Sequence, residues 1–151
     1  MARKGWRPVP ALYFFAAVLA MAALHKWLPV ARVIQGPYHL LGIVLMVSGV
    51  GLSLLGALLF VRRGTPFRPF AKSARLVTVG PYRLSRNPMY TGLVVALGGM
   101  ALFLGTLTPW VIVPVFVWLI QRFVIRVEEA LLSETFGPEY EAYRARVGRW
   151  L

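Results

Sequence analysis

The sequence predicts an all-α integral membrane protein with about four transmembrane helices. The last two form a helical hairpin, and short cytoplasmic C-terminal helices follow it. Three observations predict this class. Of the 151 residues, 58% are hydrophobic and only 15% are charged, whereas a soluble domain has about a quarter charged residues. Long uncharged runs alternate with short basic segments, and the basic residues concentrate on one side of the predicted membrane. The length allows one domain, residues 1–151.

The first predicted span lies in residues 8–24, which carry no charge. A basic tail followed by a short apolar run also fits a cleaved signal peptide. We favour a spanning helix, because further apolar spans follow. In addition, Trp6 and Trp27 flank the run, at positions where interfacial aromatic residues anchor membrane helices.

The second predicted span covers residues 40–61, which are also uncharged and long enough to cross a hydrocarbon core of roughly 30 Å. One surface of this span is small, which suits close contact with a neighbouring helix. A lipid or substrate groove is the functional alternative for that surface. Its residues are Gly42, Ser48, Gly49, Gly51, Ser53 and Gly56. After the span, residues 64–75 are predicted to form an irregular segment at the interface.

The predicted hairpin lies in the uncharged residues 87–121. As one helix this run would reach roughly 52 Å, far more than a bilayer requires. Residues 105–109, Gly-Thr-Leu-Thr-Pro, supply a turn near its midpoint. The second arm continues as a helix that carries Glu128 and Glu129 and ends at Phe136-Gly137. Pro138 can open a last helix, whose docking face contains Tyr140, Tyr143 and Val147.

The placement of charge limits the function. Although the net charge is +12, four crossings put 15 of the 17 Lys and Arg residues on one side and only Lys26 and Arg32 on the other. This pattern predicts cytoplasmic termini and argues against nucleic-acid binding. The absence of cysteine excludes thiolate metal sites and a cysteine nucleophile. His25 and His39 have no carboxylate near them in sequence, so we expect no metal centre.

Residues 80–90 form the most distinctive polar stretch. Pro81 and Pro88 restrict the backbone, which predicts an ordered loop that leads into a helix beginning near Pro88. The loop has more hydrogen-bonding groups than a connector needs: Tyr82, Arg83, Arg86, Asn87 and Tyr90. One interpretation is a juxtamembrane loop whose arginines hold lipid headgroups. The other is half of a ligand site.

The hairpin brings Glu128 and Glu129 back to the membrane face that carries Arg86 and Tyr90. Adjacent helical residues point about 100° apart, so we expect one glutamate to face inward and the other to pair with a basic neighbour such as Arg126 or Arg122. Such a site suits a zwitterionic ligand with an amine, a carboxylate and ribose hydroxyls. The structural alternative is an ion-pair latch that ties the C-terminal helices to the loop, since glutamates beside a bilayer need a partner or a function.

The motifs of residues 62–151 resemble the isoprenylcysteine carboxyl methyltransferase family, and related membrane phospholipid methyltransferases share much of the pattern. In two places the sequence departs from the family: Asn87 stands where the family has histidine, as in its bacterial branch, and Gly148 stands where proline is frequent. Residues 1–61 match only as two generic spans. The matching motifs are Leu76–Arg83, Arg86–Gly92, Glu128–Leu132, Phe136-Gly137, Tyr140, Tyr143, Val147 and Arg149-Trp150.

The resemblance implies an enzyme of the bacterial inner membrane that transfers a methyl group from S-adenosylmethionine without a Rossmann domain. A glutamate would hold the ammonium or ribose of the cofactor, and Arg86 or loop amides would hold its carboxylate. The cofactor-binding residues that it implies are Gly80, Tyr82, Arg86, Asn87, Pro88, Tyr90, Glu128 and Glu129.

The acceptor is expected to be lipophilic and to enter from the bilayer. An isoprenylcysteine-type carboxylate is the leading candidate, with an ethanolamine headgroup or a small hydrophobic thiol or acid as alternatives. An amine acceptor must lose a proton, and Glu129 is the candidate catalytic base. A lipid-binding membrane scaffold is the non-enzymatic alternative. A transporter is disfavoured, because no span has an ionisable residue at its middle.

Overall fold

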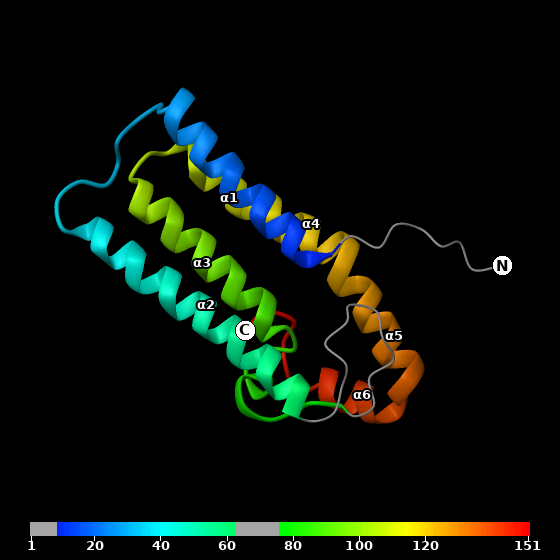
Figure 1. Ribbon diagram of the computed structural model, residues 1–151. Coiled ribbons are helices and arrows are strands. Elements are labelled where there is room, and N and C mark those ends of the chain that lie inside the picture. The colour runs from blue at the N-terminus through cyan, green and yellow to red at the C-terminus, as the bar shows by residue number, and fades with distance from the viewer. Residues whose placement is uncertain (1–8, 63–75) are drawn as a thin grey trace.

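The computed structural model describes residues 9–62 and 76–151, and this part of the chain is built from helices (Figure 1). The irregular interface segment predicted for residues 64–75 lies outside the described residues. The α-helices are α1 (Pro10–Trp27), α2 (Tyr38–Arg62), α3 (Pro88–Leu104), α4 (Ile112–Ile120), α5 (Arg126–Phe136) and α6 (Pro138–Arg144). Short 3₁₀ turns at Gly80–Arg83 and Thr108–Val111 precede α3 and α4, and a π-helical segment, Gln121–Ile125, joins α4 to α5.

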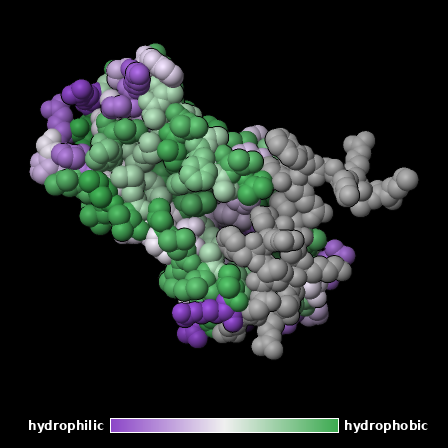
Figure 2. Space-filling view, in the orientation of Figure 1, coloured by the Kyte–Doolittle hydropathy of each residue, from purple (hydrophilic) through white to green (hydrophobic). Residues whose placement is uncertain are grey.

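The apolar helices confirm the predicted fold class. Three continuous helical stretches, Pro10–Trp27, Tyr38–Arg62 and Thr108–Phe136, are long and apolar enough to cross a membrane, and Pro88–Leu104 is a shorter apolar helix. Many large hydrophobic side chains on these helices are exposed. Figure 2 shows hydrophobic residues over the body of the bundle and hydrophilic residues towards its two ends. This distribution is typical of a protein whose sides face lipid tails.

Helices α2 and α3 lie side by side and pack through glycine (Figure 1). A Cβ added at Gly42 would lie 2.5 Å from the carbonyl oxygen of Gly99, and one added at Gly49 would lie 2.5 Å from that of Gly92. The predicted small surface is therefore a packing surface, because the backbones approach too closely for side chains. Gly51 was wrongly included, since an added Cβ there meets nothing within 4 Å.

The turn between α3 and α4 lies at one end of the bundle, as the sequence predicted. Gly105 ends α3 with a φ of 73°, a left-handed conformation that favours glycine. Its carbonyl accepts a hydrogen bond from the Val33 amide at 2.9 Å, and Leu107 donates to Ala31 at 3.0 Å. The α1–α2 connection is thus attached to the hairpin turn. The loop before α3, together with α5 and α6, lies at the other end (Figure 1).

The core lies where α1, α3 and α4 meet, and it includes Met21, Leu97, Phe116 and Ile120. Beyond α4, helix α5 ends at Phe136, the chain turns at Gly137, and α6 begins at Pro138. The end of α5 and the start of α6 were both predicted from the sequence. Tyr140 and Tyr143 of α6 are 1% and 5% exposed, which confirms that this face docks on the rest of the protein. Val147, predicted on the same helical face, instead lies beyond the end of α6 and is half-buried.

Candidate active site

A pocket lies at the end of the bundle where the loop before α3 meets α5 and α6. Its cavity volume is about 30 Å³, and the pocket is partly open to solvent. Its walls come from segments far apart in the sequence. The lining residues are Phe60, Leu76, Val77, Tyr82, Arg86, Asn87, Glu128, Glu129, Leu132, Tyr140 and Tyr143.

The loop of residues 80–87 is held in one conformation by its own hydrogen bonds. Gly80 has a φ of 60°, and Pro81 accepts bonds from the amides of Leu84 and Ser85 at 3.1 Å each. The Ser85 hydroxyl accepts the Asn87 amide at 3.0 Å. The loop therefore presents Arg86 and Asn87 to the pocket from an ordered backbone.

The π-helical segment sets the direction of both glutamates. A π turn takes one more residue per hydrogen-bonded turn than an α turn, so it rotates α5 relative to α4. Glu128 accepts a hydrogen bond from the Tyr90 hydroxyl at 2.9 Å, whereas Glu129 lies against Arg86 and Arg149. The two side chains take different partners, as expected from their angular separation on a helix.

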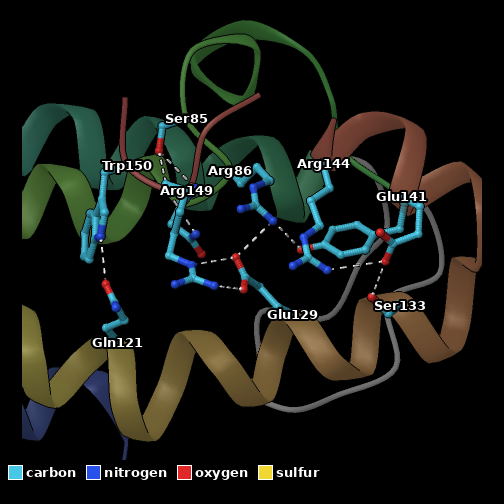
Figure 3. Close-up of polar contacts among 11 residues, drawn as sticks. Ser85, Arg86, Gln121, Glu129, Ser133, Glu141, Arg144, Arg149 and Trp150 are labelled. Carbon is cyan, nitrogen blue, oxygen red and sulfur yellow. Dashed lines mark hydrogen bonds and ion pairs between the residues drawn. The ribbon is translucent and has the colours of Figure 1, made fainter. Parts of the chain in front are cut away.

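Glu129 is the centre of a half-buried ion-pair cluster (Figure 3). Arg149 holds it with two bonds, from Nε to Oε1 at 3.0 Å and from Nη2 to Oε2 at 2.6 Å. Arg86 approaches with Nη1 at 3.1 Å from Oε1. The hydrogen bonds to Glu129 raise the pKa of Arg149. The predicted pairing with Arg126 or Arg122 is wrong for this glutamate, because Glu129 faces the loop and the end of the chain, whereas Arg122 and Arg126 are exposed.

Residues 148–150, which we call the C-terminal strap, are bonded to both walls of the pocket. The Gly148 carbonyl accepts from the Arg86 amide at 2.9 Å, and the Arg149 carbonyl accepts from Asn87 Nδ2 at 3.1 Å. The Trp150 indole donates to Gln121 Oε1 at 3.0 Å, at the start of the π-helical segment. With the Arg149–Glu129 pair, these bonds form the latch that the sequence offered as the structural alternative.

Arg86 carries an unused donor at the pocket wall. Its side chain is 10% exposed, and its Nη1 is shared between Glu129 and the Tyr140 hydroxyl, the latter at 3.3 Å. Its Nε is buried and has no hydrogen-bond partner among the described residues. A buried unpaired N–H of a charged group is unfavourable, so an acceptor from a ligand would complete this site.

Three tyrosines supply neutral hydroxyl and ring surfaces. The Tyr143 hydroxyl donates to the Tyr82 carbonyl at 2.6 Å, and that of Tyr82 donates to the Gly56 carbonyl at 3.4 Å. Burial, and then the neighbouring Tyr140, raise the pKa of Tyr143 to about 12. Burial also raises the pKa of Tyr82 and of Tyr140. These phenols therefore stay protonated at neutral pH.

The structure places the eight site residues named from the sequence in two groups, those that line the pocket and those that shape the loop or contact a lining residue. Tyr82, Arg86, Asn87, Glu128 and Glu129 line the pocket. The other three support it: Gly80 opens the 3₁₀ turn, Pro88 begins α3, and Tyr90 bonds Glu128. Sequence reasoning did not place Tyr140, Tyr143 and Arg149 at the site. All three belong to the motifs that resemble the methyltransferase family, and that resemblance was the signal that could have identified them.

No cluster of three or more histidine, cysteine, aspartate or glutamate residues that could hold a metal occurs within residues 9–62 and 76–151. The polar groups of the pocket are instead a carboxylate pair, a guanidinium, an amide and phenols. This donor set fits an organic ligand that carries both charges.

The model of the phospholipid methyltransferase family matches residues 37–139. The chain therefore belongs to this family of membrane methyltransferases, as the resemblance predicted. No solved structure matches it.

Three relatives are similar to parts of the chain. An uncharacterized protein of Haemophilus influenzae is 40% identical over 63 residues, which cover 42% of this chain and all of that protein. A nickel-cobalt-cadmium resistance protein of Alcaligenes xylosoxydans is 37% identical over 75 residues, or 50% of this chain and 35% of the relative. The protein-S-isoprenylcysteine O-methyltransferase of Schizosaccharomyces pombe is 32% identical over 113 residues, or 69% of this chain and 48% of the enzyme. The matched part of the chain thus spans about a third of the length of the resistance protein and about half of the length of the Schizosaccharomyces pombe enzyme.

Proposed function

We propose that this protein transfers a methyl group from S-adenosylmethionine to a lipophilic acceptor at the cytoplasmic face of the bacterial inner membrane. The observation that carries the proposal is the unpaired Nε of Arg86 in a pocket that also contains the carboxylate of Glu128. A guanidinium and a carboxylate in one pocket complement the carboxylate and the ammonium of an amino-acid moiety.

The proposed cofactor contacts follow from these charges. Arg86 would hold the cofactor carboxylate through Nε, and Glu128 would hold the ammonium or the ribose hydroxyls. Asn87 and the ring of Tyr82 line the same wall. Gly80, Pro88 and Tyr90 would act indirectly, by shaping the loop and orienting Glu128. Glu129 would contribute through Arg86 rather than by direct contact, since both its oxygens already accept hydrogen bonds.

When bound, the sulfonium of the cofactor supplies an activated methyl group. The protein's contribution to in-line transfer is to align the acceptor with that methyl and to limit water. A carboxylate or thiolate acceptor needs no base. For an amine acceptor, the geometry favours Glu128 over the sequence-based candidate Glu129 as the proton acceptor. Glu128 has one hydrogen bond among the described residues, from Tyr90, whereas two arginines hold Glu129.

Two acceptor classes have specific support. The similarity to the Schizosaccharomyces pombe enzyme favours an isoprenylcysteine-type carboxylate. The family match favours the ethanolamine headgroup of a phospholipid. Either acceptor is lipophilic, and the exposed apolar side chains of the helices would let it approach from the bilayer. The basic residues on the pocket side of the predicted membrane favour the cytoplasmic face.

Calorimetric binding of S-adenosylhomocysteine to purified protein in nanodiscs tests the cofactor proposal. We expect saturable micromolar binding that is lost in an Arg86→Ala, Glu128→Ala double variant. Methyl transfer to farnesylated N-acetylcysteine and to phosphatidylethanolamine would then distinguish the acceptors. Failure of the folded, unsubstituted protein to bind S-adenosylhomocysteine would exclude the proposal and favour a lipid-binding scaffold.

A further inference from the structure

Arg149 does not line the pocket, yet it is the residue that holds Glu129 most tightly. Its guanidinium contacts both carboxylate oxygens, at 3.0 and 2.6 Å, and such two-bond pairs are the strong form of the arginine–carboxylate contact. Its side chain is 28% exposed, against 13% for Glu129. Arg149 therefore approaches the glutamate from the more open side, and Arg86 approaches from the buried side.

This arrangement leaves Arg86 with a single ion-pair contact to Glu129. Nη1 of Arg86 lies 3.1 Å from Oε1 and also donates to Tyr140, while its Nε stays unpaired among the described residues. Without Arg149, the same carboxylate would be free to take two parallel bonds from Arg86, which is the favoured geometry for that pair. Arg86 would then turn its Nε edge away from the pocket.

We infer that Arg149 is a positioning residue, which occupies Glu129 so that Arg86 keeps its Nε edge for the carboxylate of a ligand. The backbone of the C-terminal strap supports this role. It is bonded to the loop that carries Arg86, through the Gly148 and Arg149 carbonyls, so Arg86 and Arg149 are held at a fixed separation. The inference deepens the proposed function and rests on it, because it concerns how the cofactor's carboxylate is bound.

Two probes isolate the effect. S-adenosylhomocysteine has a carboxylate, and 5′-methylthioadenosine shares its adenosine and sulfur but lacks the amino-acid part. In the full-length protein in nanodiscs, Arg149→Met should weaken S-adenosylhomocysteine binding about tenfold, the usual effect of one hydrogen bond to a charged group. It should leave 5′-methylthioadenosine binding unchanged. Arg146→Met is the matched control, because Arg146 is exposed and its side chain bonds the Ala142 carbonyl of the preceding helix, α6.

A second variant separates positioning from simple attachment of the strap. Adding Glu129→Gln to Arg149→Met removes the carboxylate that draws Arg86 away, so the double variant should regain most of the S-adenosylhomocysteine affinity. If Arg149 only attached the strap, the double variant would bind no better than Arg149→Met alone. Thermal unfolding of each variant confirms that folded protein is compared.

The outcomes distinguish the two proposals. Equal loss of both probes in Arg149→Met, or no recovery in the double variant, overturns the positioning role while the proposed function stands. If the unsubstituted protein binds neither probe, the proposed function fails, and the positioning role fails with it.

Discussion

The two ends of the helical bundle are both cross-linked, but by different chemistry. At the hairpin turn, the links are hydrogen bonds of hydroxyl, imidazole and backbone groups: His25 Nδ1 lies 2.9 Å from the hydroxyl of Thr106, which is 1% exposed, and Thr108 donates to the Leu28 carbonyl at 2.9 Å. At the pocket end, the links are ion pairs around Glu129, and one buried donor, Arg86 Nε, has no partner among the described residues.

The difference separates a structural joint from a binding site. Buried polar groups in a structural joint are paired within the protein, and an exception needs an explanation. The described side chains of the hairpin end meet that condition with backbone, hydroxyl and imidazole bonds between segments far apart in the sequence. The pocket end does not, although its charged groups make an unpaired donor more unfavourable there. The incomplete end is therefore where a ligand is expected.

Substitutions of Arg86 and Glu128 should have the largest effect on binding. Each removes a charged group from the pocket wall, so Arg86→Ala and Glu128→Gln should each weaken S-adenosylhomocysteine binding by about 100-fold. Calorimetry measures this. Binding within threefold of the unsubstituted protein in either variant would contradict the proposed contacts.

Gly49→Ala should have the next largest effect, on stability. Gly49 belongs to the interface that joins the two ends, and its added Cβ would lie 2.5 Å from the Gly92 carbonyl oxygen. Overpacking of this kind costs about 1–3 kcal/mol, which a lower thermal unfolding temperature would report. Gly51→Ala is the control, because nothing lies within 4 Å of its added Cβ. Equal unfolding temperatures for the two variants would contradict the close packing.

Gln121→Leu should have a smaller effect, confined to the pocket end. It removes the acceptor of the Trp150 indole and leaves a partly buried N–H unpaired, at a cost of about 1 kcal/mol. Loosening the strap should weaken S-adenosylhomocysteine binding severalfold, measured by calorimetry. A Gln121→Glu variant keeps the acceptor and should retain binding. A loss as large as that of Arg86→Ala would assign Gln121 a direct role.

Thr106→Val should have the smallest effect on binding. It removes the hydroxyl that contacts His25 and keeps the side-chain shape, so the protein should lose about 1 kcal/mol of stability. The affinity for S-adenosylhomocysteine should not change, because Thr106 lies in the turn between α3 and α4, and this turn is at the other end of the bundle from α5 and α6 (Figure 1). Loss of binding in a folded variant would contradict the separation of the two ends.

The ordered loop and the helix ends were predictable because their causes are local. Pro88 and Pro138 each begin a helix, and Gly105 and Gly137 each end one, as proline and glycine do from their backbone restrictions alone. The shared face of Arg86 and Glu129 also followed, since a hairpin of two equal arms returns the chain to its starting side. These conclusions needed only charge spacing and turn residues.

The pairing inside the site was not predictable in the same way. The sequence offered Arg126 or Arg122, which lie near Glu129 in the chain, as a partner for one glutamate, whereas the structure pairs Glu129 with Arg86 and Arg149. The choice depends on the side of α5 that faces the loop, which the π-helical segment sets, and on the return of the chain after α6, which brings Arg149 to Glu129. Nothing in the local hydropathy of residues 121–125 indicates a π turn in place of an α turn.

The sequence by itself determined the number of apolar helices, the hairpin turn, the motif and the polar residues available for a site. Only the tertiary structure decided which of those residues face one another. Burial in a bilayer depends on the composition of each segment, so it can be read along the chain. The partner of a charged side chain depends on the rotation and packing of several helices at once. For that reason the contacts of Glu128, Glu129 and Arg149 emerge only when the chain is folded.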